Sequence, residues 1–277
     1  GSGELAAHIC LDGEEGLIKQ IDKSIERQVE RLINKWPDAA HIAYLQSHTN
    51  TYAPVSVLKK LYFAILENPK IDGIAIATRP DCLGIDENGE SEILDLLSEI
   101  NKEHFLWVEL GLQTSNDATL KKLNTCYTSS EYKKAASALS SRGIRFVSHL
   151  ILGLPGETYD DMVNSVNFVC KECPKPFGLK LHLMNLVKNS PLAIENGAVA
   201  PEHPGNYAPY FSSIEEYISL VTSLLEIIPS DITIHRLTGD VPRKLLISPE
   251  WSYKKRTILN GINKMLKDKN TYQGRLA

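Results

Sequence analysis

The sequence predicts an α/β protein in which parallel strands alternate with outer helices and form a closed or partly closed (β/α) barrel. Short apolar segments recur along the chain, and amphipathic segments of helical length lie between them, which is the pattern of βαβ units. The apolar runs are nearly continuous, so the strands need cover on both faces. The chain has 277 residues, 43% of them hydrophobic, which is enough for a large core.

The expected elements follow one another in regular alternation. The strands are short, apolar and bounded by turn or polar residues, at 40–47, 71–78, 105–113, 145–153, 179–187 and 231–237. The helices have amphipathic periodicity, at 14–35, 54–67, 90–102, 129–142, 157–170, 213–228 and 251–267. Pro54, Ser91 and Ser129 lie near helix starts, and Gly143 follows a helix end. Glu157 is expected in the first turn of its helix, where its charge suits the helix dipole.

Residues 193–212 interrupt the alternation, with prolines at 201, 204 and 209. An irregular segment of this length in a compact domain is either a lid or substrate loop, or an excursion over the surface. Basic residues follow in the 243–267 region. They are either solvated helix charge or the contact of an anionic substrate.

Composition excludes several classes of protein. With 30 basic and 34 acidic residues the net charge is −4, which gives no chain-wide electrostatic signal for nucleic acid. No apolar stretch approaches the roughly 20 residues of a membrane helix, so we expect no membrane partner. The five cysteines, at 10, 82, 126, 170 and 173, are too sparse for a secreted disulfide scaffold. Together these features favour a cytoplasmic protein.

Polar side chains gather at the carboxyl ends of the predicted strands, where a parallel barrel binds its ligands. In chain order they are Gln46, Ser47, His48, Thr49, Asn50, Thr78, Arg79, Asp81, Glu109, Gln113, His149, Lys180, His182, Asn185, Lys188, His235, Arg236, Thr238 and Asp240. Burying such groups costs free energy unless they are paired. A ligand site explains the set as a whole, and an internal network, for example Glu109 with Lys180 or Arg79, is the alternative for single residues.

Several motifs, in order and at barrel spacing, carry a family resemblance. They are the segments YLQSHTNTYAP (44–54), TRPDCL (78–83), ELGLQT (109–114), HLILGLPGE (149–157), KLHL (180–183) and HRLTGD (235–240). This combination closely resembles the YhcC-like family of radical S-adenosylmethionine (SAM) proteins, within the coproporphyrinogen-oxidase-like and elongator-like superfamily. The resemblance implies a partial (β/α) TIM-type barrel over residues 1–190, without its first strand and cysteine loop. A C-terminal insertion, final strand and helix over residues 191–277 would pack on it.

The resemblance also implies cofactors and roles. A 4Fe–4S cluster would cleave bound SAM to methionine and a 5′-deoxyadenosyl radical, which abstracts hydrogen from an unknown substrate. The residues carried over by motif as contacts of SAM are Gln46, Ser47, Thr49, Thr78, Arg79, Gln113, His149, Ile151 and Gly153. Of these, Gln113 and His149 would contact the nucleoside, and Ile151 and the Gly153 turn would pack the adenine. The expected catalytic residues, which lie deeper along their strands and would act on the substrate, are Glu109, Lys180 and His182.

The sequence departs from the family pattern in two places. Family members carry three cluster cysteines, spaced as C-x3-C-x2-C or with a longer first gap, and this chain has no such motif. We therefore expect no metal ligands in this sequence, with the first strand and cysteine loop lying upstream of it. Thr125 stands where the family usually has arginine, which puts a ribose or carboxylate contact there in doubt.

Partners and rival functions follow from the same residues. A radical SAM enzyme needs an electron donor such as flavodoxin or ferredoxin, and a tRNA substrate is an analogy with elongator-type relatives that no base-reading motif supports. One rival is a cluster-free (β/α) barrel lyase or aldolase with Lys180 or Lys188 as amine nucleophile. The other is a non-catalytic barrel that serves as a binding module.

Overall fold

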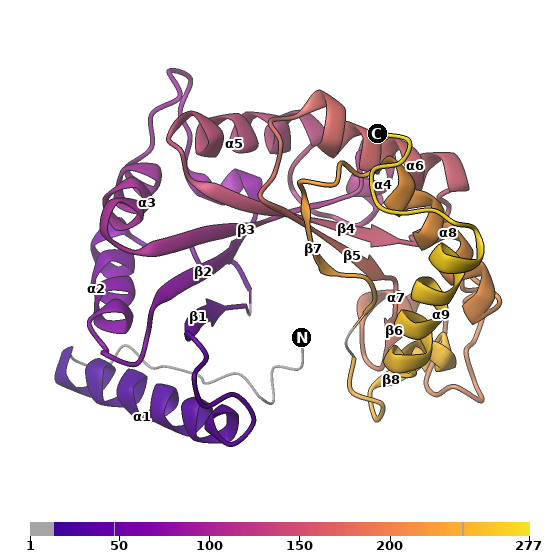
Figure 1. Cartoon of the computed structure of the whole chain (residues 1–277), viewed down its shortest axis with the longest axis horizontal. Coiled ribbons are helices and arrows are strands. Elements are labelled where there is room, and N and C mark those ends of the chain that lie inside the picture. Colours follow the sequence, from indigo (N-terminus) through magenta and orange to yellow (C-terminus); the bar gives the residue numbers. More distant parts are fainter. Residues whose placement is uncertain (1–13, 47, 240) are drawn as a thin grey trace. The chain divides into compact units, whose positions relative to one another are not determined.

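The computed structural model describes residues 14–46, 48–239 and 241–277. Its main sheet has six strands in the order β1-β2-β3-β4-β5-β7, and a second sheet pairs β6 with β8. Helices separate successive strands of the main sheet, as Figure 1 shows. This order is that of consecutive βα units, so the predicted α/β class is confirmed.

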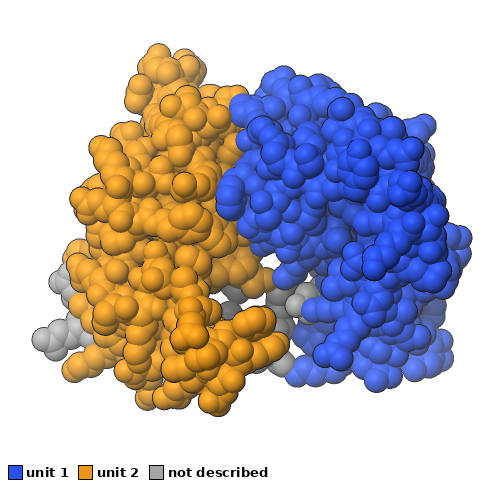
Figure 2. All heavy atoms as spheres, in the orientation of Figure 1, with its two compact units in different colours: residues 1, 111–133, 147–277 blue, residues 2–110, 134–146 orange. Residues whose placement is uncertain are grey.

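The described chain divides into two compact units, which Figure 2 colours separately. Residues 14–110, without 47, and 134–146 belong to unit 2, and residues 111–133 and 147–277, without 240, belong to unit 1. Strands β3 (Phe105–Gln113) and β4 (Arg145–Leu152) and helix α5 (Ser129–Ser141) contribute residues to both. Each unit has its own set of buried apolar side chains. The predicted division at residue 190 stays a prediction.

Unit 2 contains three strands and the helices that cover them. Its elements are α1 (Glu14–Ile33), β1 (Ile42–Leu45), α2 (Val55–Leu66), β2 (Gly73–Thr78), the 3-10 turn η1 (Pro80–Leu83), α3 (Glu92–Glu103), β3 up to Leu110, α5 from Lys134 and the first two residues of β4. β1 pairs with β2 and β2 with β3 in parallel. Pro54 and Ser91 are the N-caps of α2 and α3, as expected, and the Ser91 hydroxyl accepts from the Leu94 amide. β2 is buried along nearly its whole length, which agrees with cover on both faces.

Unit 1 continues the alternation. Its elements are the end of β3, α4 (Asp117–Lys122), the start of α5, most of β4 (Arg145–Leu152), α6 (Tyr159–Asn167), the π-helical turn η2 (Phe168–Glu172), β5 (Gly178–Leu183), α7 (Pro191–Glu195), α8 (Ile214–Ile227), β7 (Thr233–Arg236), the 3-10 turn η3 (Glu250–Tyr253) and α9 (Lys255–Asp268). β4 and β5 pair in parallel, with His149 opposite Lys180. A register shift between β5 and β7 brings Arg236 opposite Lys180. Helices α8 and α9 pack against each other (Figure 1).

The predicted strand 179–187 is wrong in its second half. β5 ends at Leu183, and β6 (Leu186–Val187) pairs antiparallel with β8 (Leu246–Ser248) in the small sheet. The chain turns at Asn185, whose side-chain Nδ2 donates to the Leu183 carbonyl oxygen at 2.9 Å. An asparagine side chain competes with the strand ladder in this way, while the apolar run on either side looks continuous in sequence.

The helix predicted to include Glu157 in its first turn begins at Tyr159, with Thr158 as its N-cap. Thr158 and Asp161 form a capping box, in which the Thr158 hydroxyl and amide hold the pKa of the Asp161 carboxyl below its usual range. The expected dipole role of Glu157 is therefore wrong. Asp160 and Asp161 supply the acidic first turn instead.

The insertion at 193–212 is packed. Its residues Ala193, Ala198 and Tyr207 form a buried cluster with Leu186 and Ile247 of the small sheet. Phe211 at its end is also buried, with ring contacts to Tyr210 and Tyr217. The segment is thus an ordered excursion with a core of its own.

Candidate functional site

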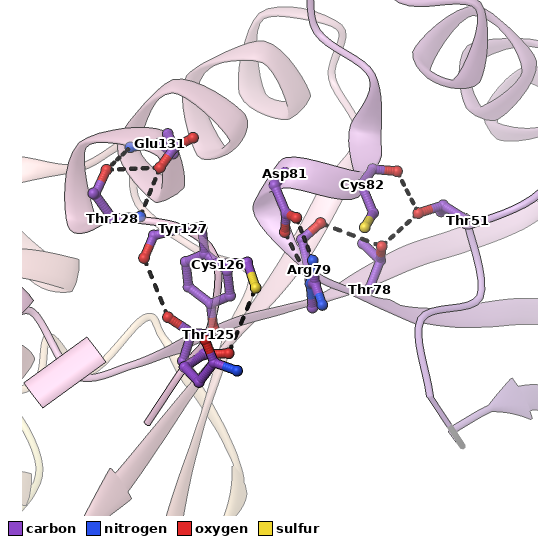
Figure 3. Close-up of polar contacts among 11 residues, drawn as sticks. Thr51, Thr78, Arg79, Asp81, Cys82, Thr125, Cys126, Tyr127, Thr128 and Glu131 are labelled. Atoms are coloured by element: carbon purple, nitrogen blue, oxygen red, sulfur yellow. Dashed lines mark hydrogen bonds and ion pairs between the residues drawn. The ribbon is translucent and has the colours of Figure 1, made fainter. Parts of the chain in front are cut away.

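In unit 2, hydroxyl groups connect the loop after β1 with the end of β2 (Figure 3). The buried Thr51 and Thr78 hydroxyl oxygens are 2.5 Å apart, and Thr51 donates to the carbonyl oxygen of Cys82 at 2.6 Å. Thr78 is therefore the donor to Thr51 in this pair. This network is sufficient to explain a buried threonine at 78, and its contact with SAM stays a prediction.

Arg79 and Asp81 form a two-point ion pair beside that network (Figure 3). Arg79 Nε lies 3.0 Å from Asp81 Oδ1, and Arg79 Nη2 bonds Asp81 Oδ2. Fork geometry of this kind fixes the plane of a guanidinium group. Burial, and then the Asp81 charge, raise the pKa of the neighbouring Cys82 thiol. Cys82 is thus held as a neutral thiol.

A cavity of about 520 Å³ opens next to Cys82 within unit 2. Its lining comes from the segments that follow β1 and β2 and from the first turn of α3, namely Thr51, Tyr52, Ala53, Pro54, Asp81, Cys82, Gly84 and Ile93. The predicted cofactor residues Thr78 and Arg79 precede the lining residues Asp81 and Cys82 in sequence, but they do not line the cavity themselves. The cavity was not predicted, because its shape depends on how two loops pack.

The end of β1 and the loop after it hold three of the predicted contacts of SAM. Gln46 is exposed and Thr49 half-buried, while Ser47 lies outside the described residues. Asn50 fixes the loop, because its Nδ2 donates to the carbonyl oxygens of Leu45 at 2.9 Å and Ala77 at 3.1 Å. Among the polar residues at the strand ends, Asn50 therefore stabilises the fold of this loop.

Glu109 is deeply buried on β3, with 2% of its surface exposed. Its Oε1 accepts a hydrogen bond from Trp107 Nε1 at 2.8 Å, two residues earlier on the same face of the strand. Sequence reasoning missed Trp107, although the two-residue spacing was a signal that could have identified it.

In unit 1, the end of β3 places Gln113 in a strained conformation. Its φ is 73°, in the left-handed region that residues other than glycine rarely adopt. A Cβ added at Gly111 would lie 2.6 Å from Gln113 Nε2 and 3.7 Å from the hydroxyl oxygen of Tyr127. Because residue 111 is a glycine and has no Cβ, the Gln113 amide has room in this position.

A buried polar cluster joins the loops that follow β3 and β4. The Thr114 hydroxyl donates to Glu157 Oε1 at 2.5 Å and lies 3.1 Å from the Ser165 hydroxyl. Burial raises the pKa of Glu157, against the effect of the Thr114 hydrogen bond. Glu157 Oε2 is also buried and finds no hydrogen-bond partner in the part of the chain that the structure describes.

The carboxyl ends of β4 and β5 bring four predicted site residues together. His149 is opposite Lys180 in the ladder and Ile151 opposite His182, so all four side chains face the same side. The His149 and His182 rings lie 5.3 Å apart. Burial, and then the charges of His149, Arg236 and Lys180, lower the pKa of His182 to about 3. The His182 imidazole is therefore neutral at physiological pH.

Gly153 directly follows β4 and has a φ of 81°. Other side chains occupy the space where a Cβ of residue 153 would lie. A Cβ there would lie 2.8 Å from a ring carbon of Phe211 and 3.3 Å from Tyr210 Cβ. Glycine is required both for the turn and for the close approach of Phe211. Its predicted contact with adenine stays a prediction.

Thr125 has a local role in the turn that precedes Tyr127 (Figure 3). Its hydroxyl lies within hydrogen-bonding distance of the Leu120 carbonyl oxygen, at 3.3 Å. It also lies 3.2 Å from the Tyr127 carbonyl oxygen, the contact that Figure 3 draws. Asn124 and Cys126 on either side have φ of 53° and 65°. The threonine thus stabilises a tight turn and carries no charge to offer a ligand.

Within the described residues, no three His, Cys, Asp or Glu side chains gather as a metal site. Cys82, Cys126, Cys170 and Cys173 are free thiols, and Cys10 lies outside the described residues. Burial raises the pKa of both Cys170 and Cys173 to about 11, which disfavours the thiolate form that binds iron. These cysteines do not fit a 4Fe–4S cluster.

The comparisons with known proteins define the class. Residues 16–169 match the radical SAM superfamily, and residues 176–268 match the radical SAM C-terminal domain. The chain therefore belongs to the radical SAM superfamily.

The relatives include proteins of the predicted YhcC-like group. The chain is 39% identical over 277 residues to the uncharacterized protein YtqA of Bacillus subtilis, covering 99% of this chain and 78% of that protein. It is 34% identical over 262 residues to the uncharacterized protein MJ0486 of Methanocaldococcus jannaschii, covering 93% and 74%. It is 29% identical over 229 residues to YhcC of Escherichia coli, covering 82% and 69%. The predicted resemblance is confirmed.

A solved structure supports the fold. The archaeal Elp3 of Methanocaldococcus infernus, with an N-terminal deletion, superposes with a TM-score of 0.68 at 18% sequence identity. The alignment covers 92% of this chain and 60% of that chain. At this identity the likeness concerns the fold alone, and it confirms the predicted radical SAM type of α/β fold. Among the described helices, none has the length and apolar character that crossing a membrane requires.

Proposed function

We propose that the protein is a radical SAM enzyme, which cleaves SAM reductively at a 4Fe–4S cluster and abstracts hydrogen from a substrate. The observation that carries the proposal is the superfamily match over residues 16–169, which contains most of the polar strand ends. The strain at Gln113 supports it, because a left-handed glutamine costs free energy that folding alone does not require.

The cofactor contacts proposed in unit 1 are Gln113, His149, Ile151 and Gly153. Those proposed in unit 2 are Gln46, Ser47, Thr49, Thr78 and Arg79. Bound SAM, reduced through the cluster, supplies a carbon radical that removes a hydrogen atom. Gln113 suits the nucleoside because its amide both donates and accepts, and Gly111 leaves room for that amide. The cluster ligands would come from outside the described residues, since the cysteines among these do not fit them.

Glu109, Lys180 and His182 are proposed to act on the substrate. The His182 imidazole is neutral, so one ring nitrogen can donate and the other can accept a hydrogen bond with the substrate. Glu109 is a buried acceptor fixed by Trp107, and Lys180 is buried on the same face of β5 as His182. Groups held by strands in this way are better oriented than groups on loops.

The proposal includes partners and a location. Reductive cleavage consumes one electron, so a donor such as flavodoxin or ferredoxin is required. We place the protein in the cytoplasm, where a reducing environment keeps thiols and the cluster ligands reduced. A nucleic-acid substrate is not part of the proposal.

The test is an anaerobic assay for 5′-deoxyadenosine on the full-length gene product after cluster reconstitution and reduction. We expect slow cleavage of SAM without substrate, and a loss of about tenfold or more in Gln113→Ala and His149→Ala through misplacement of the nucleoside. The 277-residue chain is the control, in which iron analysis and EPR are expected to detect no stoichiometric cluster.

Two outcomes would contradict the proposal. A reconstituted protein with a full cluster but no 5′-deoxyadenosine points to the binding-module alternative. Trapping of a carbonyl compound on Lys180 or Lys188 by borohydride points to the lyase or aldolase alternative.

A further inference from the structure

Unit 1 carries buried polar atoms without partners at the carboxyl ends of two neighbouring strands. His182 Nε2 on β5, Asn185 Oδ1 just after β5 and Thr238 Oγ1 just after β7 are buried and make no hydrogen bond within the described chain. Thr238 has only 5% of its surface exposed. Nearly all buried polar atoms in folded proteins are paired, so three orphans at one pair of strand ends need an explanation.

The same strand ends carry a cation that has no counter-charge among the described residues. Arg236 is half-buried, and its guanidinium group has no ion-pair or side-chain hydrogen-bond partner among residues 14–46, 48–239 and 241–277. The register shift in β7 puts Arg236 opposite Lys180, on the side of the sheet that His182 faces. Its charge is among those that lower the pKa of His182, which places the two groups within electrostatic reach.

Three neighbouring groups act on His182 in the same direction. Lys180 on β5, Arg236 on β7 and His149 on β4 each disfavour a proton on His182. A half-buried guanidinium group that has no counter-charge among the described residues is favourable to a bound anion. Arginine offers two parallel donors to an oxyanion, and the His182 and Thr238 atoms can each donate one hydrogen bond more.

We infer that the carboxyl ends of β5 and β7 bind an oxyanion, a carboxylate or phosphate group of the substrate, with Arg236 as its counter-charge. His182 and Thr238 complete the hydrogen bonds to that group, and Asn185 Oδ1 accepts from a donor next to it. The assignment of the oxyanion to the substrate rests on the proposed function. The existence of the anion-binding site does not depend on that function. The expected substrate class is therefore a small acid or phosphate ester with a neighbouring hydroxyl or amine.

The experiment is NMR of the histidine-15N-labelled 277-residue protein, titrated with inorganic phosphate and separately with acetate in chloride at constant ionic strength. The His182 signals are assigned by their absence in His182→Gln. We expect a saturable shift of the His182 resonances, because an anion stabilises the imidazolium form. We expect Arg236→Gln to bind about tenfold more weakly, as for the loss of one charge-assisted pair. Comparison of the two anions distinguishes a phosphate from a carboxylate site.

The matched control is Arg256→Gln, which removes the same charge from an exposed position on α9 and is expected to bind like the wild type. The inference is overturned if neither anion shifts His182 saturably, or if Arg236→Gln responds like the wild type. It is also overturned if SAM alone displaces the anion, because the site would then belong to the cofactor. Binding is measured without SAM cleavage, so failure here and failure of the proposed function are separate results.

Discussion

At the scale of single residues, the proposed cofactor site depends on the absence of a side chain at Gly111 as well as on the side chains that line it. Gly111 lies under the Gln113 amide, and a Cβ there would come within 2.6 Å of Gln113 Nε2. Only the flexible end of a side chain has to move to accommodate it, so the fold tolerates the change better than the site does. Gly111→Ala therefore separates folding from positioning.

We expect Gly111→Ala to unfold at nearly the wild-type temperature, with a stability loss of about 1 kcal/mol. Its cleavage of SAM without substrate is expected to fall about tenfold, because the Gln113 amide is displaced. Thermal unfolding and the 5′-deoxyadenosine assay measure the two effects. The control is Gly16→Ala in α1, where a Cβ would meet nothing within 4 Å. Unchanged cleavage in Gly111→Ala would remove Gln113 from the proposed cofactor contacts.

At the scale of elements, the loop between β4 and α6 is tied down by a buried carboxyl group. Glu157 Oε1 accepts from Thr114, while Oε2 has no partner among the described residues, so the ionised form is poorly accommodated. Its pKa in the folded protein is raised above the ordinary value of 4.5 by burial. A carboxyl group with a raised folded pKa contributes full stability below its unfolded pKa. That contribution is lost as the pH rises through the folded pKa.

We expect Glu157→Gln to gain stability relative to the wild type as the pH rises above about 4.5, because glutamine does not ionise. Urea unfolding of both proteins across the acid-to-neutral range gives the difference at each pH. The matched control is Glu172→Gln, an exposed change in the same unit, which is expected to show no such trend. A difference that is independent of pH would contradict the raised pKa.

Most elements could be predicted because hydrophobic periodicity marks them locally, as for β3, whose bounds at 105–113 the sequence predicts correctly. The end of the strand predicted at 179–187 could not be predicted, because a side-chain hydrogen bond of Asn185 ends β5 inside an apolar run. The pairing of His149 with Lys180 follows from strand register, which two-residue alternation suggests but does not determine. The position of Arg236 depends on a register shift that leaves no mark in the sequence, so it remained one strand-end residue among many.

At the scale of the whole molecule, His182 and Glu157 impose opposite pH dependences on stability. The folded pKa of His182 is lowered from 6.5 to about 3, mainly by burial. A histidine with a depressed pKa contributes full stability above its unfolded pKa. That contribution is lost as the pH falls through the interval down to the folded pKa. His182 therefore promotes acid unfolding, whereas Glu157 lowers stability at higher pH.

We expect His182→Gln to unfold at a lower pH than the wild type and to lose less stability between pH 6.5 and 3. The shift sets an upper bound of about 5 kcal/mol on the difference at the acid end of the interval. Acid titration followed by circular dichroism, in chloride without phosphate, measures the midpoint, since a bound oxyanion would raise the pKa of His182 and mask the effect. His203→Gln, a change at an exposed histidine, is the control and is expected to keep the wild-type midpoint. If His182→Gln and the wild type lose stability with the same slope, the pKa of His182 is the same in the folded and unfolded protein, and the depressed pKa is wrong.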